Sequence, residues 1–160
     1  VPDDDVLAHR YELLDDRLQR AGFDWYEVSN WSRPGGECRH NLGYWDGGEW
    51  WGAGPGAHGF LDHTRWWNVK HPNIYAQALA DGRLPVADFE DLDADTRHTE
   101  DVMLRMRLRR GLACEDLTAD ERSRVAGLVA DGLLSVEGDR AVLTDRGRLL
   151  ADGVVRALLA

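Results

Sequence analysis

The chain has 160 residues, of which 43% are apolar and 30% charged, a composition typical of a globular protein. No apolar run reaches the roughly 18 residues that a transmembrane helix needs. The net charge of −10 disfavours nucleic acid and anionic lipid as partners, because both attract a positive surface. No basic and apolar leader opens the sequence, so we expect a cytoplasmic protein, and Val1 in place of Met predicts a piece of a longer chain.

The first part of the chain predicts a helix followed by a strand. Apolar residues at steps of four, three and four between Leu7 and Leu18 predict a helix over residues 4–21. Residues 23–29, "FDWYEVS", predict a strand, and residues 30–48 a loop. Alternation turns Glu27 away from its two neighbours on that strand, and its residue type favours a solvated or ion-paired carboxylate over a ligand-binding one.

The middle of the chain is rich in glycine and tryptophan. Residues 49–61 predict an extended glycine-rich segment that approaches another group closely, and "TRWWNV" predicts a strand. A short helix follows Pro72 and ends near Gly82, and "LPVADFEDLD" is expected to connect it to a second long helix over residues 93–110.

After Gly111 the pattern predicts a helix over residues 118–131, two strands around the turn at 137–139, and a helix capped by Thr144. This order resembles a winged-helix unit. Residues 93–160 hold 13 acids and 11 bases without a basic helix face, which favours an interaction or lid role over DNA binding.

Two kinds of site are poorly supported by spacing. The stretch 54–59, "GPGAHG", has the G-x-G-x-x-G spacing of a dinucleotide site but lacks the helix that should open inside it. The candidate ligands of a metal site are Cys38, His40, His58, His63 and His71. These residues lack the paired spacing that is typical of zinc ligands. Cys38 and Cys114 are expected to be free thiols.

The stretch 38–45, "CRHNLGYW", has the groups that a large planar ligand such as a porphyrin requires. The imidazole of His40 can ligate heme iron, and Arg39 can pair with a propionate. An apolar face of the ligand can be covered by the rings of Tyr44, Trp45, Trp50 and Trp51. The alternative is that His40 and Asn41 hydrogen-bond the loop while the tryptophans form core. Residue chemistry alone favours this second interpretation.

Together, "YEVSNWSRPGGECRHNLGYW", "WWGAGPGAHG" and "RWWN" resemble the radical SAM coproporphyrinogen III oxidase-like family, and "HNLGYW" matches the HNxxYW pattern of its HemW-type heme chaperones. The resemblance implies an α/β plus α+β fold. Residues 1–68 would be the end of a partial (β/α) radical SAM barrel, residues 69–92 a connecting helix and linker, and residues 93–160 a winged-helix-like HemN C-terminal domain.

The resemblance also implies a function: the C-terminal part of a chaperone that binds heme and transfers it to an unknown acceptor protein. The alternative is an oxygen-independent coproporphyrinogen III oxidase. Candidate heme-binding residues are His40, Asn41, Tyr44, Trp45 and Arg39. Candidate S-adenosylmethionine-proximal residues are Gly54, Gly56, Ala57 and His58. The family's C-x3-C-x2-C motif, which holds a [4Fe-4S] cluster, has no counterpart here, so we expect no complete cluster and no radical catalysis from this chain alone.

Overall fold

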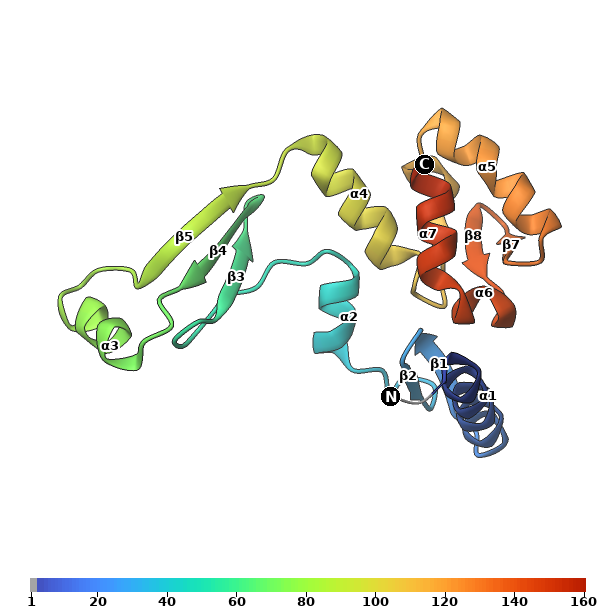
Figure 1. Ribbon diagram of the computed structural model, residues 1–160, viewed down its shortest axis with the longest axis horizontal. Coiled ribbons are helices and arrows are strands. Elements are labelled where there is room, and N and C mark those ends of the chain that lie inside the picture. Colours follow the sequence, from blue (N-terminus) through green and yellow to red (C-terminus); the bar gives the residue numbers. More distant parts are fainter. Residues whose placement is uncertain (1–2) are drawn as a thin grey trace. The chain divides into compact units, whose positions relative to one another are not determined.

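The structure is a computed structural model that describes residues 3–160, and the chain divides into two compact units. One unit joins the residues up to Asp46 with residues 102–160, and the other is residues 47–101. Figure 1 labels the elements of both. The predicted boundaries near 68 and 93 stay a prediction.

The first unit opens with α1 (Asp4–Arg20), which the apolar spacing predicted, and Asp3 caps it by accepting a hydrogen bond from the Asp5 amide. A hairpin of β1 (Asp24–Glu27) and β2 (Asn30–Ser32) follows, with Trp25 opposite Trp31. The predicted loop over residues 30–48 is wrong in two places. It contains β2 and also a two-turn helix, α2 (Arg39–Trp45), which Gly43 and the lack of a side-chain cap concealed.

Helix α4 (Ala94–Arg105) ends five residues before the predicted end at 110. The next residues pair with β1 instead: the Val28 amide donates to the Arg107 carbonyl (3.1 Å) and the Arg109 amide to the Tyr26 carbonyl (3.0 Å). Leu108, between them, is 1% exposed. The chain leaves the helix because this pairing satisfies its backbone and buries Leu108 at the same time.

The C-terminal part contains the predicted helix, hairpin and last helix in that order, but a short strand and a 3₁₀ turn precede them and the last helix is divided in two. The elements are β6 (Leu112–Ala113), a 3₁₀ turn (Cys114–Asp116), α5 (Ala119–Ala130), β7 (Leu134–Glu137), β8 (Arg140–Leu143), α6 (Asp145–Leu149) and α7 (Ala151–Leu159). Thr118 forms a capping box with Glu121, and Thr144 caps α6 through the Gly147 amide (3.0 Å). The sheet has the order β6-β8-β7, and α5 packs against α7 and β7.

The hydrophobic core lies in this first unit. Leu112, Val154 and Leu158 are fully buried between the sheet and its helices, together with Met106 from the chain after α4. Trp25 of β1 joins the same cluster. The N-terminal hairpin and the C-terminal helices therefore share one core, and the hairpin is held by apolar burial as well as by backbone pairing.

The second unit is a three-stranded antiparallel sheet with helix α3 (Pro72–Ala80) and most of α4. Strands β3 (His58–Leu61), β4 (Thr64–Asn68) and β5 (Val86–Asp91) lie in sequence order, and α3 connects β4 to β5. The predicted connecting segment "LPVADFEDLD" thus contains a strand. It was missed because every residue of β5 is exposed, so its sequence carries no burial pattern.

All strand pairs within residues 3–160 are antiparallel. A (β/α) barrel is built from parallel pairs, so the assignment of residues 1–68 to a barrel stays a prediction. Among the described residues, no helix is long and apolar enough to cross a membrane.

Candidate functional site

Helix α2 carries the whole H-N-x-x-Y-W motif. Its backbone closes with the bonds expected for an α-helix, from the Leu42 amide to the Cys38 carbonyl and from the Asp46 amide to the Leu42 carbonyl (2.9 Å each). Residues four apart lie on one face of a helix, so the motif forms two pairs, His40 with Tyr44 and Asn41 with Trp45. A loop over these residues, as predicted, would not arrange the four motif residues in two pairs on separate faces.

The pair His40 and Tyr44 faces solvent. Both residues are exposed, and their rings meet edge to face with centroids 4.9 Å apart. The His40 ring nitrogens have no hydrogen-bond partner among residues 3–160, so the structure leaves both nitrogens accessible. An exposed imidazole beside an aromatic ring is a donor set that suits an iron porphyrin.

The pair Asn41 and Trp45 is half-buried. The Asn41 amide donates to two successive residues of β1, to the Tyr26 hydroxyl (3.3 Å) and to a carboxylate oxygen of Glu27 (3.4 Å). These contacts attach one side of α2 to the strand. Asn41 was predicted to contact heme, and in the structure its amide is already engaged by the protein.

The far end of α2 is tied to the segment after α4. Asp46, which follows the helix, forms an ion pair with Arg110, and its carbonyl accepts a hydrogen bond from Arg105 (3.5 Å). At the near end, Cys38 is exposed and makes no side-chain cap. Arg39, the candidate propionate partner, is exposed in the first turn. The C-terminal end of α2 is therefore held through Asp46.

Glu27 is neither solvated nor ion-paired, contrary to the expectation from its residue type. It is 0% exposed, and no cationic side chain pairs with it among the described residues. Its oxygens accept hydrogen bonds from the Ser29 amide (3.1 Å) and hydroxyl (2.9 Å), and from the Asn30 side chain. A buried carboxylate held only by neutral donors is uncommon and calls for an explanation.

The glycine-rich segment is explained in part by close packing inside the second unit. A Cβ on Gly59 would lie 2.1 Å from the Trp66 ring, and one on Gly52 would lie 2.4 Å from the His58 backbone. Gly54 and Gly56 instead have positive φ angles, 111° and 68°, which favour glycine. Nothing lies within 4 Å of a Cβ built on Gly54, so the space beside the Cα atom of Gly54 is open and has room for a ligand.

Ala57 and His58 lie where this segment enters β3. A strand follows the G-x-G-x-x-G sequence where a dinucleotide site requires a helix, in agreement with the weak fit of that motif. The His58 ring is exposed and tilts against Trp67 with centroids 5.9 Å apart.

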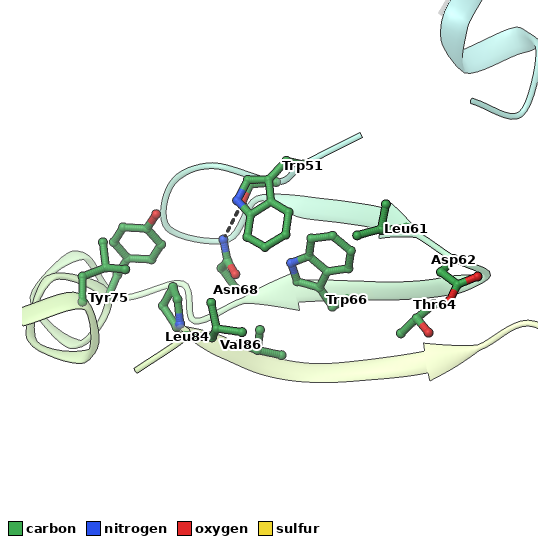
Figure 2. A pocket seen from close by; sticks show the side chains of 12 residues that line it. Trp51, Leu61, Asp62, Thr64, Trp66, Asn68, Tyr75, Leu84 and Val86 are labelled. Carbon is green, nitrogen blue, oxygen red and sulfur yellow. Dashed lines mark hydrogen bonds between the residues drawn. The ribbon is translucent and has the colours of Figure 1, made fainter. Parts of the chain in front are cut away.

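A pocket of about 310 Å³ opens beside this segment on one face of the second sheet (Figure 2). Trp51 and Trp66 meet edge to face within it, with centroids 5.1 Å apart. Its wall is mainly apolar, and Asn68 in that wall donates to the carbonyls of Gly52 (2.9 Å) and Gly54 (3.0 Å). Sequence reasoning did not find this pocket, because strand β5 closes one side of it.

The five residues considered for a metal site do not come together. Within residues 3–160, no three histidine, cysteine or acidic side chains are placed to hold a metal ion. His71 caps α3 by accepting from the Asn73 amide (3.3 Å), and the His63 ring contacts Arg97 (3.1 Å).

A buried ion pair in the first unit was not predicted. The Arg148 guanidinium, 1% exposed, donates to both carboxylate oxygens of Asp15 (2.5 and 3.1 Å) and stacks over the Trp25 ring, 4.6 Å from its centroid. Burial alone would raise the pKa of Asp15, but hydrogen bonds from Arg148 and Trp31 lower it below its ordinary value. This pair links helix α1 to the C-terminal helices across 133 positions.

Comparison with known proteins identifies related chains. Residues 92–150 match the family described as the HemN C-terminal domain. A protein of Mycobacterium tuberculosis (strain H37Rv) named heme chaperone HemW is 72% identical over 99% of this chain, and HemW of Escherichia coli K12 is 31% identical over 100% of this chain. The chain spans 41% and 44% of those two relatives.

The fold is also similar to a solved structure. The radical SAM enzyme coproporphyrinogen III oxidase (HemN) of Escherichia coli superposes with a TM-score of 0.66 at 18% sequence identity. The match covers 92% of this chain and 39% of that one. At this identity the likeness establishes the fold alone.

Proposed function

Because this chain belongs to the family that contains the HemW heme chaperones and HemN, we propose that it is the C-terminal part of a chaperone that binds heme and passes it to an acceptor protein. The acceptor is unknown. In this proposal heme is cargo that the protein holds reversibly. The site therefore needs an accessible side chain to bind the iron more than it needs an enclosed cavity.

The observation that carries the proposal is the outward face of α2. His40 is exposed, its ring nitrogens are without a hydrogen-bond partner in the described part of the chain, and Tyr44 stands against its edge. In the proposal His40 ligates the iron, Tyr44 covers part of the porphyrin face, and Arg39 meets a propionate. Asn41 holds the helix in place through Tyr26 and Glu27, and Trp45 stays a candidate heme contact.

The finer features follow from the same family and are part of the proposal. Residues 1–68 form the last part of a partial (β/α) barrel, and residues 93–160 form a winged-helix-like domain. Residues 69–92 are the helix and linker that connect the two. The full-length protein carries a [4Fe-4S] cluster and S-adenosylmethionine, and works in the cytoplasm. Gly54, Gly56, Ala57 and His58 pass near S-adenosylmethionine, and the open side of Gly54 supports that placement.

The oxidase alternative is not favoured. The two relatives named above, at 72% and 31% identity, are both named heme chaperones, whereas the likeness to HemN supports the fold only. Anaerobic incubation of the full-length protein with coproporphyrinogen III tests the alternative, and we expect no vinyl product.

Hemin titration tests the proposal. In the full-length protein, His40→Ala is expected to lose the Soret band of the ligated heme and to bind hemin at least about tenfold more weakly, as expected for loss of a direct ligand. The matched control is His9→Ala, because His9 is an exposed histidine on α1 in the same unit. An unchanged Soret band and affinity in His40→Ala would remove the assignment of His40.

A further inference from the structure

We propose that Glu27 is the positioning residue of the α2 motif: through Asn41 it sets the rotation of the helix that presents His40 and Tyr44. The effect of Glu27 on heme binding rests on the proposed function. Its structural content, that a buried carboxylate on β1 holds α2, stands on contacts within the first unit.

The surroundings of Glu27 require a carboxylate. Every group that contacts its two oxygens is a donor: the Ser29 amide and hydroxyl, the Asn30 amide and the Asn41 amide. A glutamine here would turn an NH₂ group toward other donors, and an apolar side chain would leave those donors unpaired in a buried place.

Only one of these donors comes from outside the hairpin of Glu27. Ser29 and Asn30 lie two and three positions further along the same turn, whereas Asn41 lies 14 positions away on α2. The same amide also donates to Tyr26. The carboxylate therefore joins the turn after β1 to the helix, and Asn41 is the residue through which the two are connected.

Holding Asn41 fixes the direction of its neighbour. Successive residues of an α-helix are turned by about 100°, so an Asn41 that points to β1 places His40 and Tyr44 on an adjacent face, away from the strand. Glu27 is itself held on the other side, because its backbone bridges to Leu108. Helix α2, the hairpin and the segment after α4 thus meet at this one residue.

The test is hydrogen–deuterium exchange of the full-length protein, read over residues 39–45. In Glu27→Gln and in Asn41→Ala, we expect amides of α2 to exchange about tenfold faster, as loss of a hydrogen bond to a charged group predicts. The amides of α5 are expected to keep their protection and serve as the internal check of folding. The matched control is Ser32→Ala, a buried polar residue of the same hairpin whose side chain forms no hydrogen bond to α2 within residues 3–160.

A swapped pair separates positioning from simple loss of stability. In the double variant Glu27→Gln with Asn41→Asp, the glutamine NH₂ donates to the new carboxylate, its carbonyl oxygen accepts from the Ser29 amide, and the Asn30 side-chain amide turns over to present its oxygen, so the contact to α2 is rebuilt with donor and acceptor exchanged. We expect this variant to regain α2 protection and the His40-dependent Soret band that Glu27→Gln weakens. Unchanged exchange over residues 39–45 in Glu27→Gln, or no recovery in the double variant, overturns the inference.

The two readouts distinguish this inference from the proposed function. The exchange experiment uses no heme, so it tests the Glu27 to Asn41 connection alone. If His40→Ala leaves the Soret band of the parent protein unchanged, the proposed function fails even where α2 loses protection in Glu27→Gln. If α2 keeps its protection, the positioning role fails even where His40 ligates heme.

Discussion

Removing either partner of the Asp15 and Arg148 ion pair is expected to destabilise the first unit strongly. The Arg148 side chain is 1% exposed and that of Asp15 13%, so each variant leaves a charge in a place that water hardly reaches. Loss of one partner of a buried pair costs about 3–5 kcal/mol. For a chain of this length that corresponds to a fall in melting temperature of about 6–20 °C.

The two single variants should differ in how far they lower the free energy of unfolding. Asp15→Asn leaves the guanidinium with the exposed carboxylate of Asp145 (2.8 Å) and the aromatic rings, which compensate its charge poorly. Arg148→Met leaves Asp15 with hydrogen bonds from Trp31 (2.6 Å) and Gln19 (2.9 Å), so it should cost less. Urea unfolding followed by circular dichroism measures both free energies of unfolding.

The double variant Asp15→Leu with Arg148→Met should cost less than the sum of its single changes, because it removes both charges together.

The free energy of unfolding should also depend on pH through Asp15. The pKa of Asp15 is lowered in the folded state, so its contribution to stability is present above its ordinary pKa of about 3.9 and is lost as the pH falls through the folded value. Single variants that each cost under about 1 kcal/mol, or strictly additive effects, would refute this reasoning.

Four further variants test separate parts of the fold by thermal unfolding. Thr118→Ala breaks the capping box of α5 and should cost about 1 kcal/mol; an unchanged melting temperature would show that the cap does not matter. Gly59→Ala forces a Cβ against Trp66 and should cost about 1–3 kcal/mol with altered tryptophan fluorescence, whereas Gly127→Ala, a helix position with open space, should gain about 0.5–1 kcal/mol. Tyr11→Phe removes a hydrogen bond to a backbone carbonyl of the β1–β2 turn (2.7 Å) and should cost about 1 kcal/mol. Burial raises the pKa of Tyr11, so wild-type stability should decline as the pH rises above about 10, and the phenylalanine variant should lack that decline.

The long helices and the β7–β8 hairpin were predictable because local sequence determines them. Helix α1 has its apolar spacing, α5 its capping threonine, and β7 and β8 flank a turn at Gly138. The missed elements lack such signals. Strand β2 has three residues and β6 has two, α2 contains Gly43, and the predicted last helix breaks at Leu150 into α6 and α7.

The candidate site was predictable as a set of residues but not as an arrangement. The motif identified His40, Asn41, Tyr44 and Trp45 together, and only the helix separates the exposed pair from the half-buried pair. The burial of Glu27 depends on contacts from α2 and from Leu108, 14 and 81 positions away along the chain, and no local pattern encodes them.

Chemical rescue of His40→Ala by imidazole tests the central claim, that His40 presents its ring to heme iron, most directly. With the full-length protein and hemin, the account predicts that free imidazole restores the wild-type Soret position to His40→Ala, because it occupies the vacated coordination position. Imidazole should leave the spectrum of His9→Ala unchanged. A His40→Ala protein whose heme spectrum equals that of the wild type before imidazole is added would contradict the account.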